Sequence, residues 1–190
     1  MRLFAACLCS LLLVACGTQG QDPTHAPVPT HSGVPMDVQL TDYTGPETIS
    51  QSGTVIAGVR TKGGLTIEGQ DVVIRNSHIQ GPVFMHPDSG ASLLIEDSEI
   101  DGSSLPVAKA ANLAGLSYSN ITARRVNIHH FGKSLQMENN VVLEDSWLHS
   151  VVVHGQTHNE PVLSNGGKGY TLRGNIIDAT GDYNHMTGAI

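Results

Sequence analysis

The sequence predicts an all-β fold, a right-handed parallel β-helix, and three observations lead to this prediction. A seven-residue motif with apolar and polar residues in alternation occurs five times, and successive copies start 20 to 29 residues apart. The segments between the copies are rich in glycine, serine, asparagine and histidine and show no helical periodicity. One motif position carries charges that alternate in sign from copy to copy.

The copies of the motif predict one strand each. They occupy residues 73–79, 94–100, 122–128, 142–148 and 171–177. Alternation with a period of two indicates a strand with one buried face, and parallel strands need connections of about a dozen residues or more. A repeat of this length is typical of a solenoid whose coils bury their apolar faces by stacking, wound right-handed by the usual crossover rule. One inward column is expected to contain Ile74, Ile95, Ala123, Leu143 and Leu172.

The alternating charges predict the register between coils. The third residue of each copy reads, in order, Arg75, Glu96, Arg124, Glu144 and Arg173. Strands in a sheet lie about 4.7–4.9 Å apart, and each pair of opposite charges across two strands contributes about 0.2–1 kcal/mol. Stacked coils would therefore form a ladder of charges, in which Arg75 and Glu96 are neighbours on adjacent strands.

The β-helix domain is expected to span residues 37–190. Apolar segments at 55–59 and 65–67 predict a less regular first coil, which is typical of the end of a solenoid. Each motif is followed by a glycine or polar corner and a second apolar patch, which predicts a second strand per coil. Ile190, the last residue, lies inside such a patch, so we expect a β-helix that is truncated at its C-terminal end or covered there by a partner.

The first 36 residues predict export from the cytoplasm. Arg2 precedes an apolar run, residues 3–14, that is too short to span a bilayer and is typical of a signal peptide. Leu13-Val14-Ala15-Cys16 resembles the lipobox of bacterial lipoproteins. The resemblance implies that residues 1–15 are removed and that Cys16 is acylated, which would anchor an extracytoplasmic protein to the cell membrane. The alternative is an ordinary signal peptide that is cut nearby.

The composition of the rest of the N-terminal region and of the whole chain adds three expectations. Residues 16–36 are rich in proline, threonine and glycine and predict a flexible linker. The net charge is −7 without a basic cluster, so binding to nucleic acid is not expected. Cys7 and Cys9 leave with the signal peptide and Cys16 is lipidated, so the mature chain is expected to hold no disulfide.

Five segments of the chain carry a resemblance to a known family: residues 53–56, 73–79, 95–102, 158–160 and 172–177. They resemble secreted bacterial right-handed parallel β-helix proteins, which are related in fold to pectate lyases and other polysaccharide lyases. The resemblance implies a polysaccharide or envelope glycan as partner, a basic residue as catalytic base and, in a lyase, Ca²⁺ held by acidic side chains. One fold hosts many functions.

Two departures from that family bear on activity. The family often has Asp-Gly where this chain has Glu160-Pro161. Its members often continue for further coils beyond the position of Ile190, so a fragment of a larger β-helix enzyme is one alternative.

The residues that directly follow the motif copies predict a functional corner. They are Gln80, Asp101, His129, His149 and Asp178. When stacked, they would place two imidazoles and two carboxylates along one corner, as in a sugar-binding stripe, an acid/base pair or a metal site. A column of ordinary turn residues is the alternative. Because no tight spacing of His, Cys or Asp is present, no metal site is predicted, and no cofactor is expected apart from Ca²⁺ in a lyase.

Three further features add candidate residues. The loop His158-Asn159-Glu160 offers a histidine and a carboxylate for acid/base chemistry, although a merely polar loop is the alternative. Lys133 and Arg125 are the basic residues left free by the charge ladder. Trp147, the only tryptophan, occupies an outward position, from which it could stack on a sugar or pack under a loop.

We therefore expect a membrane-anchored protein that binds or degrades polysaccharide, and that is a lyase or a glycoside hydrolase if it is an enzyme. A non-catalytic structural or surface-interaction protein is the alternative. The candidate catalytic residues are His129, His149, His158, Glu160, Lys133 and Arg125. The candidate ligand-binding residues are Trp147, Asp101, Asp178 and Asn159.

Overall fold

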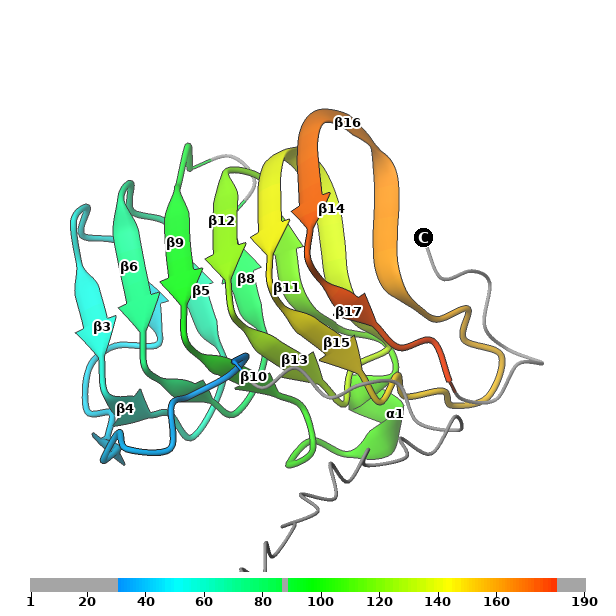
Figure 1. The fold of residues 1–190 in the computed structure, drawn as a ribbon, viewed down its shortest axis with the longest axis horizontal. Helices are drawn as coiled ribbons and strands as arrows, with labels where there is room; N and C mark the ends of the chain where they lie inside the picture. The colour runs from blue at the N-terminus through cyan, green and yellow to red at the C-terminus, as the bar shows by residue number, and fades with distance from the viewer. Residues whose placement is uncertain (1–30, 87–88, 181–190) are drawn as a thin grey trace, which may run out of the picture.

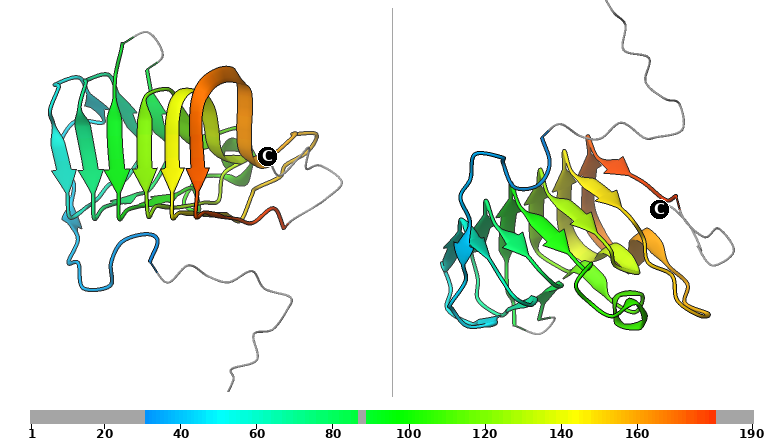
Figure 2. Two further views of the ribbon diagram at one scale, coloured as in Figure 1. Left: turned by 45° about the horizontal axis from the view of Figure 1, so that its top comes forward. Right: turned by 90° about the horizontal axis from the view of Figure 1, so that it is seen from below.

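The chain folds into a parallel β-helix. A computed structural model describes residues 31–86 and 89–180, and every strand pair within these ranges is parallel. Successive coils stack along one axis, so strands that are far apart in the sequence lie side by side (Figure 1). The turned views in Figure 2 show the strands of each coil arranged around a common interior. The predicted all-β solenoid is confirmed.

The strands are divided between two sheets. The seven-stranded sheet consists, in spatial order, of β1 (Thr41–Asp42), β4 (Val59–Arg60), β7 (His78–Ile79), β10 (Glu99–Asp101), β13 (Asn127–His129), β15 (Trp147–His149) and β17 (Ile176–Ile177). The ten-stranded sheet has two arms that meet at β14 (Lys133–Glu144). One arm contains β2 (Thr48–Ile49), β5 (Leu65–Ile67), β8 (Val83–Met85) and β11 (Ala114–Tyr118). The other contains β3 (Val55–Ala57), β6 (Val72–Arg75), β9 (Leu93–Glu96) and β12 (Ile121–Arg124), and β16 (Glu160–Arg173) pairs with β14.

The seven-residue motif forms two strands, and the prediction of a single strand is wrong. In the copy at residues 73–79, β6 belongs to the ten-stranded sheet and β7 to the seven-stranded sheet. The residue between the strands has a positive φ in all five copies: Asn76 (49°), Asp97 (49°), Arg125 (50°), Asp145 (50°) and Gly174 (68°). A left-handed residue turns the chain sharply, so the apolar residues before and after the corner can face one interior.

The core lies where the apolar columns predicted it. Ile74, Ile95 and Leu143 are fully buried, Ala123 is nearly so, and Leu172 is half-buried against the core. The last residues of the motif form a second buried column on the seven-stranded sheet, which contains Ile79, Ile100, Ile128 and Leu148. Large side chains stacked on their equivalents in the next coil remove apolar surface from water at every repeat.

The charge ladder has the predicted register. Arg75 lies opposite Glu96, and Glu96 lies opposite Arg124 on the next strand. Arg124 and Arg173 flank Glu144 on its two sides. Glu144 accepts a hydrogen bond from each of these arginines, at 2.9 Å from Arg124 Nε and 2.8 Å from Arg173 Nη2.

A buried serine column supports the corner of the coils. The hydroxyls of Ser77, Ser98 and Ser146 each donate to the carbonyl oxygen two residues earlier, at 2.7 Å. Each also accepts a hydrogen bond from a backbone N–H of the preceding coil; Ser98 Oγ, for example, lies 3.1 Å from the nitrogen of Ser77. These hydroxyls satisfy polar backbone groups that the turn withdraws from the regular ladder.

The segment before β1 lies along the domain. Gly33 is buried and donates from its backbone nitrogen to the carbonyl oxygen of Arg125 at 2.9 Å. Within the described ranges, α1 (Val107–Ala110) is the only helix, and no helix there is long and apolar enough to cross a membrane. Cys16, the expected lipid-bearing residue, and Ile190 lie outside the described residues.

Candidate functional site

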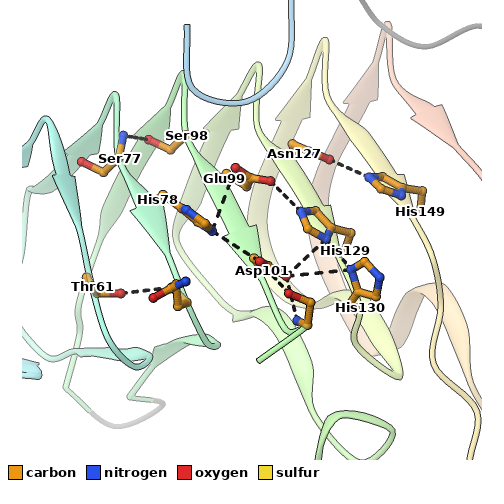
Figure 3. Close-up of polar contacts among 12 residues, drawn as sticks. Thr61, Ser77, His78, Ser98, Glu99, Asp101, Asn127, His129, His130 and His149 are labelled. Atoms are coloured by element: carbon orange, nitrogen blue, oxygen red, sulfur yellow. Dashed lines mark hydrogen bonds and ion pairs between the residues drawn. The ribbon is translucent and has the colours of Figure 1, made fainter. Parts of the chain in front are cut away.

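Titratable side chains gather on the outer side of the seven-stranded sheet. The histidine cluster, as we name it, consists of His78, Glu99, Asp101, His129 and His130 (Figure 3). Its residues come from β7, β10, β13 and the turn after β13. Register brings them together, because Glu99 lies opposite His78, and Asp101 lies opposite His129.

Glu99 and His129 form the shortest ion pair of the cluster. The Nε2 atom of His129 lies 2.8 Å from Oε1 of Glu99. This hydrogen bond is the main reason that the pKa of Glu99 is lowered, against the opposing effect of burial and with help from the nearby His78 and His129 charges. Glu99 is therefore an ionised acceptor at neutral pH, and His129 carries a proton on Nε2.

Asp101 is held at the end of β10 by the turn that follows it. Burial by itself would raise the pKa of Asp101, but hydrogen bonds from Ser103 and the charge of His129 lower it below its usual value. The backbone nitrogen of Ser103 donates to Oδ1 at 2.7 Å, and its hydroxyl donates to Oδ2 at 2.9 Å. His78 Nε2 lies 3.4 Å from Oδ2, is buried, and has no hydrogen bond within the described part of the chain.

His130 turns back toward the cluster because its backbone is left-handed, with φ of 60°. Its Nδ1 atom lies 2.6 Å from Nδ1 of His129 and 3.8 Å from Oδ1 of Asp101. Burial and the charge of His129 lower the pKa of His130. Gly102 allows the backbone of His130 to lie close to the preceding coil, since a Cβ at position 102 would lie 2.1 Å from the carbonyl oxygen of His130.

A row of flat rings extends from the cluster toward the C-terminal coils. This stacked row contains Trp147, His149 and His129. The rings of Trp147 and His149 are 3.7 Å apart at 22°, and those of His149 and His129 are 4.9 Å apart at 20°. Burial, together with the charges of His129 and His130, lowers the pKa of His149 to about 4. His149 is therefore neutral at pH 7, with its Nε2 2.9 Å from Oδ1 of Asn127.

The structure brings together some of the predicted site residues. Asp101, His129 and His149 lie in one column across three adjacent strands, and Trp147 stacks on that column. Asp178 follows β17 in the next coil, and its charge opposes the lowering of the pKa of His149, which burial dominates.

The loop before β16 and the first residue of that strand provide three other candidates. His158 is exposed, whereas Asn159 is buried and donates to the carbonyl oxygen of Val152, which gives it a role in shaping the loop. Glu160 is buried and lies opposite Lys133 on β14. These two residues are neighbours in the ten-stranded sheet, while His129 and His149 belong to the seven-stranded sheet.

Arg125 is not the free basic residue that the sequence predicted. Its guanidinium binds both carboxylate oxygens of Asp97, with Nε 2.6 Å from Oδ1 and Nη2 2.7 Å from Oδ2. Nη2 also lies 3.6 Å from Oε2 of Glu96. Arg125 occupies the left-handed corner between the two sheets, so its charge is used to connect neighbouring coils.

Sequence reasoning did not select His78, Glu99 or His130. His78 and Glu99 occupy the sixth motif position, which faces outward and pairs across strands. His130 directly follows His129. The sequence signal for His130 was therefore this pair of adjacent histidines, one coil after Asp101. A search for short spacings along the chain does not detect residues that meet only because coils stack.

The donor atoms of the cluster can be compared with the Ca²⁺ implied by the lyase resemblance. Ca²⁺ takes six to eight oxygen ligands, whereas the two carboxylates here are surrounded by imidazoles. This set does not fit Ca²⁺. Ligand atoms of Asp101, His129 and His130 all lie within 4.8 Å of one another. No protein family, curated protein or solved structure matches the chain.

Proposed function

We propose that the protein is an extracytoplasmic, lipid-anchored β-helix protein that binds polysaccharide on the outer side of its seven-stranded sheet, with a fold related to that of pectate lyases. The stacked row of Trp147, His149 and His129 is the observation that supports this proposal. Because His149 is stacked between Trp147 and His129, the row offers mainly ring edges to sugar rings. The adjacent Asn127 and Glu99 offer hydrogen-bonding groups for hydroxyls.

The arrangement suits a polymer better than a small molecule. His129 and His149 stack along the solenoid axis, where each coil adds one strand spacing of about 4.8 Å, and Trp147 extends the row along β15. A chain of sugars lying along the axis would meet equivalent positions on β10, β13 and β15 in turn. The N-terminal signal and lipobox support a location at the cell envelope, where such polymers are found.

Affinity electrophoresis in gels that contain neutral or uronate-rich polysaccharides tests the binding. Replacement Trp147→Ala should weaken retardation by roughly tenfold in the gel that retards the wild type, since stacked aromatic contacts contribute strongly. The matched control is Phe84→Ala, which removes a half-buried aromatic ring that packs against Tyr118 on the ten-stranded sheet. Equal loss in both variants, or no retardation on any polymer, would contradict the proposal.

Polysaccharide cleavage is a second candidate function, favoured by the position of His129 between two carboxylates. Its Nε2 contacts Glu99 and its Nδ1 lies 3.4 Å from Oδ1 of Asp101. A histidine oriented by a carboxylate is a suitable general acid or base. Assays for new reducing ends and for the absorbance of unsaturated uronates would detect hydrolase and lyase activity. Activity that survives the change His129→Gln would reject this residue as the catalyst, and binding without cleavage would favour the non-catalytic role.

Membrane anchoring through Cys16 is tested separately. Replacement Cys16→Ser should release the protein from the membrane fraction, because a non-acylated N-terminus has no lipid to insert. Mass spectrometry of the mature N-terminus provides a direct measurement. An unmodified N-terminus on a membrane-bound wild-type protein would contradict lipidation.

A further inference from the structure

We propose that Asp101, His129 and His130 form a binding site for a divalent transition-metal ion of the zinc type. The inference concerns these side chains alone and does not depend on polysaccharide binding. Three potential ligand atoms converge there (Figure 3): Oδ1 of Asp101, Nδ1 of His129 and Nδ1 of His130. Their separations are 2.6 Å between the two nitrogens, 3.4 Å from His129 to Asp101 and 3.8 Å from His130 to Asp101.

The distances are close to those of a coordination shell. Zn–N and Zn–O bonds of about 2.0–2.2 Å in a tetrahedral site place ligand atoms about 3.3–3.5 Å from one another. The contacts of Asp101 with the two histidines match this spacing to within about 0.5 Å. The two imidazole nitrogens would have to separate by less than about 1 Å, and the side chain of His130 is partly exposed.

The contact with Glu99 selects the tautomer of neutral His129 that can act as a ligand. In this tautomer Nε2 carries the proton that is donated to Glu99, so Nδ1 presents a lone pair toward His130 and Asp101. Metal-binding histidines almost always donate their other ring N–H to a carboxylate, a carbonyl or water in this way. Glu99 therefore has the position of an orienting residue, not of a metal ligand.

Asp101 is oriented in a similar manner. Both of its oxygens accept hydrogen bonds from Ser103, which leaves the remaining lone pair of Oδ1 available. On its other side lies His78, whose buried Nε2 has no hydrogen bond within the described residues and faces Oδ2 at 3.4 Å. Hydrogen-bonded ligating carboxylates are typical of metal sites.

The donor set selects the class of ion. Two imidazole nitrogens and one carboxylate oxygen suit Zn²⁺ and its neighbours Co²⁺, Ni²⁺ and Cu²⁺, whereas Mg²⁺ and Ca²⁺ require oxygen ligands. Three protein ligands leave a fourth position for water.

Calorimetric titration of the full chain with Zn²⁺, after removal of metals with a chelator, tests the proposal. One Zn²⁺ per chain is expected, and Co²⁺ bound in its place should give the visible absorption of a tetrahedral complex. The change His130→Ala should weaken Zn²⁺ binding at least tenfold, and Glu99→Gln should weaken it about tenfold through the orientation of His129. The far-ultraviolet circular dichroism of His130→Ala should match that of the wild type, because this side chain is not part of the core.

The control is His86→Ala, which removes an exposed histidine at the end of β8 and should leave the affinity unchanged. Absence of Zn²⁺ binding by the wild type would overturn the proposal, and the contact between the two histidines would then be a simple hydrogen bond. Equal affinity in His130→Ala and the wild type would also overturn it. The titration contains no polysaccharide, so its failure is distinguishable from failure of the carbohydrate experiments.

Discussion

Arg124 and Glu144 lie directly opposite each other on β12 and β14, and their side chains are joined by a hydrogen bond of 2.9 Å. Arg173 binds the other oxygen of the same carboxylate from the next coil. Glu144 thus connects three successive coils through one side chain. This arrangement is part of the charge ladder that the sequence predicted.

The pH dependence of stability should reveal the contribution of Glu144. The hydrogen bond from Arg124, aided by Arg173 and opposed by desolvation, lowers the pKa of Glu144 in the folded state. The stabilisation is therefore fully present above the ordinary glutamate pKa of about 4.3 and is lost as the pH falls through the lower folded value. Urea denaturation at several pH values should show less acid sensitivity in Glu144→Gln than in the wild type.

Glu47 provides the control for this experiment, because it is an exposed carboxylate on the loop before β2. The change Glu47→Gln should leave the pH profile unchanged. If Glu144→Gln has the same pH profile as the wild type, the ion pairs of the ladder do not stabilise the fold.

The serine column predicts a loss of stability on removal of one hydroxyl. Ser98→Ala removes the acceptor of the Ser77 N–H and leaves that buried donor without a partner. The expected decrease in the free energy of unfolding is about 1–3 kcal/mol, measured by chemical denaturation. Ser104→Ala, at an exposed position in the turn after β10, should change it by less than about 0.5 kcal/mol. A similar small change in both variants would show that the column does not contribute.

Close packing of coils predicts a large effect at Gly102. In Gly102→Ala, the new Cβ would lie 2.1 Å from the carbonyl oxygen of His130, so the backbone of one coil must move. The expected destabilisation is about 1–3 kcal/mol. In Gly63→Ala the nearest atom to the new Cβ is Oε1 of Glu47 at 3.7 Å, an ordinary contact, and stability should be maintained or slightly raised. A tolerated Gly102→Ala would contradict the described approach of the two coils.

The only tryptophan reports on the stacked row. Its indole ring lies 3.7 Å from the imidazole of His149, which shields one side of it from water. The change His149→Ala should shift the fluorescence emission of Trp147 to longer wavelength and raise its quenching by iodide. The same measurements on His86→Ala should match the wild type, and unchanged spectra in both variants would exclude the stacking.

The stacking of coils was predictable from the sequence because it depends on apolar and charged residues that recur at the same motif positions. Ile74, Ile95 and Leu143 fall into one column by simple alignment, and the alternating charges fix their register. The corner inside the motif was not predictable in the same way, because Arg125 and Gly174 occupy equivalent left-handed positions and share no side-chain chemistry. A short strand, a left-handed residue and another short strand give nearly the same apolar alternation as one longer strand.

One part of the candidate site could be predicted from the sequence, and another part could not. The column of Asp101, His129 and His149 followed from the repeat, since each residue comes directly after a motif copy. The direction of His130 did not follow, because it depends on a positive φ that histidine adopts only in a suitable turn. The ion pair of Arg125 with Asp97 also depends on this corner geometry, so the sequence alone could not predict it.

The one-dimensional pairing of the β-helix has a mechanical consequence. Each strand of the seven-stranded sheet pairs only with its equivalents in the coils before and after it. A pulling force applied to the two ends of the domain would therefore peel one coil at a time and would not rupture the whole core at once. Each event would release 18 to 29 residues, the separation of paired residues in adjacent coils, or about 60–100 Å of extended chain, so a force–extension curve should show a series of steps.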